Sequence, residues 1–336
     1  MTASSGHSGL VLDVRLVEGR RADVDEHHEL QRAASLVDHP QSPPPTREAV
    51  LARLRDPDVD LGEGLLWTAR LDGRLAGFLT AHLPVDGNEH LTFARIVVHP
   101  SSRRQGIGSE LLRTGADALR HRGRVIVEVS QVESNSPGAR FVAARGFRTV
   151  NTSVVQTLEF SEVDPVIWDV EPPPGYRLVR WVGHAPEDLV ESYAQARRAI
   201  ADAPPGQSAF RVPDWTVERV RRLEAGYRQH GIERRVVVAV SPSGAVVGVT
   251  ELDLQPLRPE LAAQRDTAVL AAHRGLGLGQ AMKALMLRWI TADKTALRRV
   301  WTSTASANQY MADVNHRLGF ATVRRYSVVN RELAGL

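Results

Sequence analysis

The chain has 336 residues, of which 43% are hydrophobic and 24% are charged, and its formal net charge is +3. This length favours two domains, and the composition is ordinary for a soluble globular protein. Because the sequence has no cysteine, disulfides, thiolate metal sites and a cysteine nucleophile are excluded. Arginine pairs are scattered along the chain instead of forming one basic stripe, so we expect no nucleic-acid partner.

The sequence also shows no pattern of export or membrane insertion. Residues 1–20 contain no apolar run that resembles a signal peptide. No segment approaches the roughly 20 apolar residues that span a bilayer. We therefore expect a cytoplasmic protein without a membrane partner.

Strands and helices alternate through the first half of the sequence. The strongest local signals are Asp72-Gly73, which predicts a hairpin turn, and Gly123, which ends a helix. In chain order we predict a strand at 11–17, helices at 23–37 and 47–55, two strands within 64–83, a strand at 91–100, a helix ending at Gly123, a strand at 124–129, a short helix at 136–147 and a strand at 149–160.

A proline-rich segment predicts the domain boundary. Residues 161–175 include three consecutive prolines, which form a stiff spacer. We expect a first domain at 1–162, a linker at 163–174 and a second domain at 175–336.

The same order of elements begins again after this segment. The second half is predicted to contain a strand at 176–182, helices at 186–200 and 214–231, strands at 234–240, 243–254 and 265–273, a helix after residue 277, a strand at 298–305, a helix at 308–320 and a strand at 321–329. Arg103 and Arg274 lie 171 positions apart, and Gly146 and Gly319 lie 173 apart. These spacings predict a tandem duplication. The fold class is α/β of the α+β type, with a mixed, mostly antiparallel sheet flanked by helices in each half.

A glycine-rich turn precedes a helix in both halves. The patterns are Arg103-x-x-Gly106-x-Gly108 and Arg274-x-x-Gly277-x-Gly279. Glycine lets backbone N–H groups converge, and the helix N-terminus adds partial positive charge, so each turn suits a pyrophosphate. Neither turn has the lysine of an ATP-binding loop or the spacing of a dinucleotide fold. The alternative is a turn that binds no ligand. The same turn occurs at the same place in both halves, which argues against this alternative.

Both halves resemble the Gcn5-related N-acetyltransferases (the GNAT superfamily), which carry R/Q-x-x-G-x-G/A after the fourth strand. The resemblance includes the Gly-Phe pair that ends the last helix, at Gly146-Phe147 and Gly319-Phe320. The second half is similar to actinobacterial two-domain members, among them relatives of mycothiol synthase. The resemblance implies acetyl-CoA, or another acyl-CoA, as the cofactor.

The resemblance also implies which residues hold the cofactor. Its pyrophosphate would lie on the two loops, and its pantetheine arm would follow the edge of the fourth strand. The implied residues are Ile96, Val97, Val98, Arg103, Arg104, Gln105, Gly106, Ile107, Gly108 and Ser109 in the first half, and Ala268, Val269, Leu270, Arg274, Gly275, Leu276, Gly277, Leu278, Gly279, Gln280 and Asn308 in the second.

Acyl transfer to an amine needs a base, because an alkyl ammonium with a pKa near ~10 is protonated at neutral pH. Many family members place a glutamate eight residues before the loop arginine. Here that position is Asp266 in the second half and Arg95 in the first, and an arginine cannot serve as a base. We therefore expect the second half to be catalytic and the first to be a possible non-catalytic copy. Glu251 is a second candidate base, and Glu89 is the first half's best candidate; each also fits a structural carboxylate.

Family members often carry a tyrosine, the acid toward the leaving thiolate, four residues before the Gly-Phe glycine. Those positions are Val142 and Asn315 here. Asn315 can donate a hydrogen bond to the CoA sulfur but not a proton. Tyr310 is either a replacement acid or a packing residue.

The leading hypothesis is an enzyme that transfers an acyl group, most simply acetyl, to a small-molecule amine. The long segment 184–232 is expected to cover the acceptor. The alternative is a non-catalytic acyl-CoA-binding sensor or scaffold, which the absent tyrosines and Arg95 favour. His27-His28 lacks metal-ligand spacing, so no metal is predicted.

Overall fold

The computed structural model describes residues 11–18, 21–40, 43–55, 59–202 and 206–336. The chain forms two compact units. The N-terminal unit comprises Met1–Val85, Glu89–Ser130 and Arg331–Leu336, and the C-terminal unit comprises Asp86–Asn88 and Gln131–Asn330.

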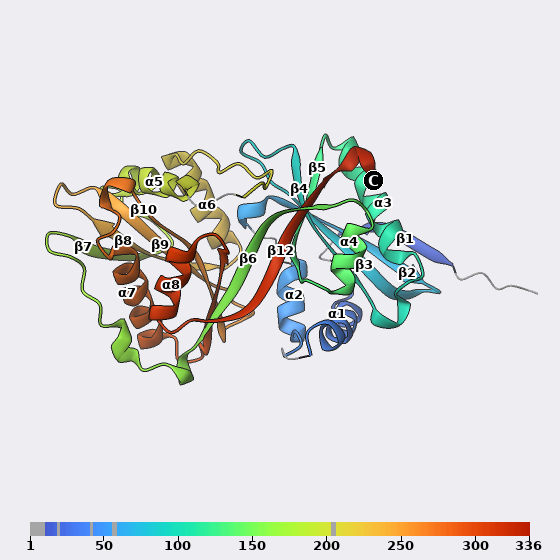
Figure 1. The fold of residues 1–336 in the computed structure, drawn as a ribbon, viewed down its shortest axis with the longest axis horizontal. Helices are drawn as coiled ribbons and strands as arrows, with labels where there is room; N and C mark the ends of the chain where they lie inside the picture. The colour runs from blue at the N-terminus through green and yellow to red at the C-terminus, as the bar shows by residue number, and fades with distance from the viewer. Residues whose placement is uncertain (1–10, 19–20, 41–42, 56–58, 203–205) are drawn as a thin grey trace, which may run out of the picture. The chain divides into compact units, whose positions relative to one another are not determined.

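Figure 1 labels the helices and strands of both units. The strands are β1 (Leu12–Val17), β2 (Glu63–Leu71), β3 (Arg74–Leu83), β4 (Leu91–Val98), β5 (Ile126–Val132), β6 (Arg148–Glu159), β7 (Arg177–Val182), β8 (Glu233–Val240), β9 (Val246–Leu254), β10 (Leu261–Val269), β11 (Arg299–Ala305) and β12 (Ala321–Glu332).

The α-helices are α1 (Val24–Asp38), α2 (Arg47–Arg55), α3 (Ile107–His121), α4 (Pro137–Ala143), α5 (Val190–Arg197), α6 (Val217–Gln229), α7 (Leu278–Asp293) and α8 (Gln309–Arg317). Short 3₁₀ turns include η3 (Pro100–Ser102), η6 (Arg198–Asp202) and η7 (Ala271–His273). The elements follow the predicted order, and the predicted hairpin turn at Asp72-Gly73 is confirmed.

In the N-terminal unit the strand order is β1-β2-β3-β4-β5. The pairs are antiparallel except β4 and β5, which are parallel. Helices cover both faces of this sheet, as two neighbouring residues of β3 that point to opposite sides show. Phe78 packs with Leu30 of α1, whereas Leu79 lies under Gly115 of α3.

In the C-terminal unit the order along β6 to β7 is β6-β11-β10-β9-β8-β7, again with one parallel pair, β10 and β11. Gly248 of β9 lies against Met282 of α7. Glu251, on the opposite face of the same strand, contacts Tyr193 of α5. The fully buried residues of α7, with Val237 and Leu252 among their neighbours, form the largest part of this unit's core.

The last strand of the first repeat belongs to the sheet of the C-terminal unit. β6 pairs antiparallel with β11 from Arg299↔Glu159 to Ala305↔Ser153. It also pairs with β12, which is the last strand of the second repeat. The boundaries of the compact units therefore differ from those of the sequence repeats. The predicted limits of 1–162, 163–174 and 175–336 describe the repeats, and they remain a prediction.

Candidate active site

The parallel strand pair of each unit separates part of the way along. β4 and β5 are paired from Leu91↔Ile126 to Ala94↔Val129, but β4 continues to Val98. β10 and β11 are paired only from Leu261↔Arg299 to Ala263↔Trp301, but β10 continues to Val269. Beyond the last paired residues, the backbone of β4 has no hydrogen bonds to β5, and the backbone of β10 has none to β11. Each strand therefore has an open edge there. Such an edge can form hydrogen bonds with an extended ligand.

Both glycine-rich turns present a row of free backbone donors. Within the described residues, the N–H groups of 104–108 and of 275–279 donate to no protein acceptor. Gly106 and Gly277 stand at the N-caps of α3 and α7 with φ of 81° and 79°. A Cβ at either glycine would meet nothing within 4 Å, so the space above each turn is open. Converging N–H groups at a helix start suit a pyrophosphate, and the turns therefore fit coenzyme A.

The loop arginines are used mainly to hold the loops in place. Arg103 Nε donates to Val98 O at 3.3 Å, and its guanidinium forms two hydrogen bonds with Asp38 at 2.8 and 2.7 Å. Arg274 Nε donates in the same way to Val269 O at 2.9 Å, and its guanidinium pairs with Asp202. Each arginine thus ties its loop to the end of the preceding strand and to a carboxylate of the same unit.

Residues around the second loop are also fixed by local contacts. Asn308, a predicted cofactor-binding residue, is the N-cap of α8 and accepts a hydrogen bond from Met311 N–H at 3.2 Å. His273 Nδ1 lies 2.8 Å from the Tyr176 hydroxyl. In the first loop, His99 accepts a hydrogen bond from Ser101 N–H at 3.3 Å, which stabilises the turn.

Asp266, the predicted base, lies in a β-bulge. The register of β10 against β9 shifts between Gln264 and Thr267, so Asp266 is displaced from the regular ladder. Bulges redirect side chains and are frequent beside active sites. The side chain is 47% exposed, and its Oδ2 lies 3.3 Å from Arg197 Nη2. Asp266 therefore reaches solvent between the open strand edge and a single arginine.

Glu251, the second candidate base, is enclosed. Its side chain has no solvent exposure, and it pairs with Arg197 at 2.6 Å and with Arg234 at 3.4 Å. The Tyr193 hydroxyl donates to the same carboxylate. Burial raises the pKa of Glu251, and the two guanidinium groups oppose that rise. Burial alone would lower the pKa of Arg197, but the Glu251 carboxylate raises it, so Arg197 stays charged.

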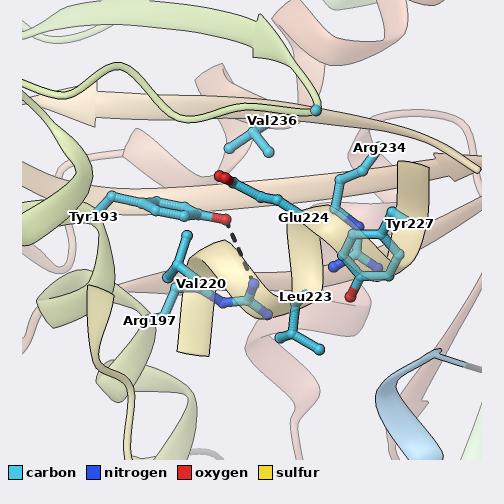
Figure 2. Close-up of a pocket in the computed structure, with 9 residues that line it drawn as sticks. Tyr193, Arg197, Val220, Leu223, Glu224, Tyr227, Arg234 and Val236 are labelled. Carbon is cyan, nitrogen blue, oxygen red and sulfur yellow. Dashed lines mark hydrogen bonds between the residues drawn. The ribbon is translucent and has the colours of Figure 1, made fainter. Parts of the chain in front are cut away.

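Arg197 connects the two candidate carboxylates. Its guanidinium contacts Glu251 on one side and Asp266 on the other, and it stacks on Trp215 with 3.5 Å from Cζ to the ring centroid. Figure 2 shows Arg197 beside Tyr193, and Arg234 beside Tyr227. Sequence reasoning missed Arg197 and Arg234, because an arginine on an amphipathic segment ordinarily indicates a solvated face.

Residues of segment 184–232, which is predicted to cover the acceptor, line two pockets. One, shown in Figure 2, has a volume of ≈ 10 Å³, which is room for about one water molecule. Its walls come from α5, α6, β8 and Gly183, the residue after β7, and include Tyr227 and Glu224. The other, of ≈ 300 Å³, lies at the start of α6. Its carboxylates include Asp86, which pairs with Arg219 and Arg222, and Asp214, which pairs with Arg198.

Asn315 lies in a closed polar cluster. Its side chain is fully buried and donates to Gln156 Oε1 at 2.8 Å and to Thr304 Oγ1 at 3.4 Å. Its Oδ1 has no hydrogen-bond partner. Tyr310 is 56% exposed, so the packing alternative is wrong for this residue. The predicted contact of Asn315 with the CoA sulfur remains a prediction.

The first repeat differs at the corresponding positions. Arg95 pairs with Thr80 in a regular ladder, without a bulge. Val142, at the position of the family tyrosine, is buried on α4. Within the described residues there is no group of three or more His, Asp or Glu side chains that could hold a metal ion. The same part of the chain contains no helix of the length and apolar character that crossing a membrane requires.

The acetyltransferase (GNAT) family model matches this sequence twice, at residues 25–147 and 200–320. The chain belongs to the acetyltransferase (GNAT) family. Membership confirms the predicted two-copy fold and the predicted class of enzyme, an acyl-CoA-dependent N-acetyltransferase.

Individual relatives extend over nearly the whole chain. A mycothiol acetyltransferase of Salinispora arenicola is 28% identical over 311 residues, which is 91% of this chain and 94% of the relative. A second, from Salinispora tropica, is 27% identical with the same coverage. Among solved structures, a tandem GNAT protein from the clavulanic acid biosynthesis pathway has a TM-score of 0.78 and 26% identity, covering 96% of this chain and 99% of that one. A GNAT structure from Sphaerobacter thermophilus shares the fold, with a TM-score of 0.69 and 18% identity.

Proposed function

We propose that the C-terminal unit transfers an acetyl group from acetyl-CoA to the amine of a small molecule, with Asp266 as the general base. The observation that carries this proposal is the position of Asp266 in the β10 bulge, exposed and next to the open strand edge. Arg95 stands at the same position of the first repeat and cannot accept a proton. The relatives named as mycothiol acetyltransferases support a small-molecule acceptor.

The cofactor would supply the activated acyl thioester, and backbone groups of the second loop would hold it. The free N–H groups of 275–279, at the positive end of α7, would bind its pyrophosphate. The unpaired edge of β10 at Ala268 and Val269 would bind its pantetheine arm. The first loop has the same row of free donors, so the N-terminal unit would bind coenzyme A as well.

Asp266 would remove the proton from the acceptor ammonium, directly or through a water molecule. Arg197 pairs with this carboxylate at 3.3 Å and fixes its direction. Glu251 does not reach solvent, so we assign it the role of holding Arg197 in place through the 2.6 Å ion pair. Glu251 is then a positioning residue, and Asp266 is the group that touches the acceptor.

The test is release of free thiol from acetyl-CoA in the presence of a panel of small amines. Replacing Asp266→Asn removes the base and is expected to lower turnover by about 10²–10⁴-fold. Asp169→Asn is the matched control, because Asp169 is also paired with an arginine, Arg288 at 3.0 Å, but is 71% exposed and distant in sequence from the loop. Control turnover should equal that of the wild type.

A different outcome would favour the sensor. Binding of acetyl-CoA to the full chain without thiol release for any amine in the panel would favour a non-catalytic acyl-CoA-binding sensor or scaffold. If Asp266→Asn keeps full turnover with an active amine, the enzyme stands but the assignment of the base is wrong.

A further inference from the structure

Arg95 extends from β4 of the N-terminal unit, directly before the strand edge at Ile96–Val98. It faces Thr80 of β3 and lies on the side of Phe78, which is the face that α1 covers. The residue is exposed, yet the surrounding protein lowers the pKa of its guanidinium through desolvation. The Arg95 guanidinium therefore lies in a partly desolvated environment that is still accessible to solvent.

Arg95 has unusually weak partners for such a group. Among the described residues its polar contact is the neutral amide of Gln31, with Nη1 to Oε1 at 3.5 Å, and its guanidinium lies 5.9 Å from the Phe78 ring centroid. The same Gln31 oxygen already accepts from Arg53 at 3.2 Å. No ion pair with a carboxylate is found for Arg95 in the part of the chain that the structure describes. Its counterpart Asp266, by contrast, has Arg197.

A second polar side chain beside Phe78, His27, has one ring nitrogen without a hydrogen-bond partner. His27 is 1% exposed, and its ring lies 5.4 Å from that of Phe78. Nδ1 is 2.9 Å from Asp23 O, and because a carbonyl only accepts, Nδ1 carries the hydrogen. Nε2 is then an acceptor, and it has no hydrogen-bond partner. His27 stands one helical turn from Gln31 on α1, and its ring and the Arg95 guanidinium both lie near the Phe78 ring.

We propose that Arg95 binds the carboxylate of a ligand in the N-terminal unit, at the place where the C-terminal unit has its base. A guanidinium can form two parallel hydrogen bonds with a carboxylate, and desolvation strengthens them. The carboxylate can come from two sources. It is either the far end of an acyl group on coenzyme A, held by the free donors of 104–108, or a free carboxylic acid. The first source rests on the proposed binding of coenzyme A to the first loop, and the second does not.

Calorimetry on the full chain tests the proposal with three probes: acetyl-CoA, succinyl-CoA and succinate. Succinyl-CoA adds a terminal carboxylate to an acyl group, and succinate offers the carboxylate alone. We expect one of the two CoA sites to bind succinyl-CoA at least ~10-fold more tightly than acetyl-CoA, since hydrogen bonds to charged groups contribute that much. Arg95→Gln should abolish this preference, and Arg95→Lys should restore part of it.

Arg74→Gln is the matched control, because Arg74 is an exposed arginine of the neighbouring strand β3. Succinate that binds only when Arg95 is present would assign the site to a free acid. If Arg95→Gln changes the binding of neither succinyl-CoA nor succinate, the proposal is overturned. Failure of acetyl-CoA to bind at all would instead refute the proposed function, and the succinate measurement would still decide the role of Arg95.

Discussion

The two repeats share their strand order, their open strand edge and their glycine-rich turn, but differ in what stands at one position of the fourth strand. In the second repeat a bulge turns Asp266 toward solvent, beside Arg197. In the first repeat the ladder is regular, and Arg95 carries the opposite charge. The backbone of the glycine-rich turn is therefore the same in both repeats, because it needs only the glycines and the start of a helix. The side chain that we propose as the base has no equivalent in the first repeat, where Arg95 stands at its position.

The largest effect on stability is expected at Glu251, whose counterpart in the first repeat is Thr80. Glu251→Gln leaves Arg197 and Arg234 buried with less compensating charge, and such a loss costs about 3–5 kcal/mol in the free energy of unfolding. Thr80→Val should cost less than about 1 kcal/mol. Urea denaturation of both variants measures the difference. Equal effects at the two positions would show that Glu251 does not hold the arginines.

The contributions of the two loops to binding and turnover can be distinguished by substituting the N-cap glycines. Gly277→Val places a side chain at a φ of 79° and blocks the row of donors, so kcat/KM for acetyl-CoA should fall by about 30–100-fold. Gly106→Val, at a φ of 81°, should leave turnover unchanged and remove one equivalent of bound CoA. Steady-state kinetics and calorimetry on the same samples give both quantities. A loss of turnover in Gly106→Val alone would assign catalysis to the first repeat.

A smaller effect is expected at Lys283, where the first repeat has the buried Leu112. Burial lowers the pKa of Lys283 to about 7, from 10.5 in the unfolded chain. Between these values the unfolded chain holds a proton that the folded chain lacks, so stability rises with pH; below pH 7 both hold it and the cost is complete. Lys283→Leu should therefore raise the free energy of unfolding by roughly 1–3 kcal/mol at pH 6.5 and by much less at pH 10. A gain that is independent of pH would mean that only packing has changed.

Much of the fold could be predicted from the sequence, and the reasons are local. The Asp72-Gly73 turn, the helix that starts after Gly106 and the 171-residue repeat are all set by residues close together in the chain. The pairing of β6 with β11 could not be predicted, because alternating hydrophobicity indicates a strand but not its neighbour.

The candidate site divides in the same way. The loops follow from spacing and Asp266 from the resemblance to the GNAT superfamily, whereas the bulge around Asp266 depends on how β9 and β10 align. The burial of Glu251 between Arg197 and Arg234 depends on how helix α5 and strand β8 pack against β9. The enclosure of Asn315 likewise depends on Gln156, which is 159 positions away in the chain.

The position of β6 constrains how this protein can be divided. A chain cut in the proline-rich segment would leave the second piece without the strand that runs between β11 and β12. Those two strands would then expose unpaired edges along a stretch that is otherwise buried. A fragment that contains only the second repeat would therefore lack one strand of its own sheet, so we expect the full chain to be the unit that folds.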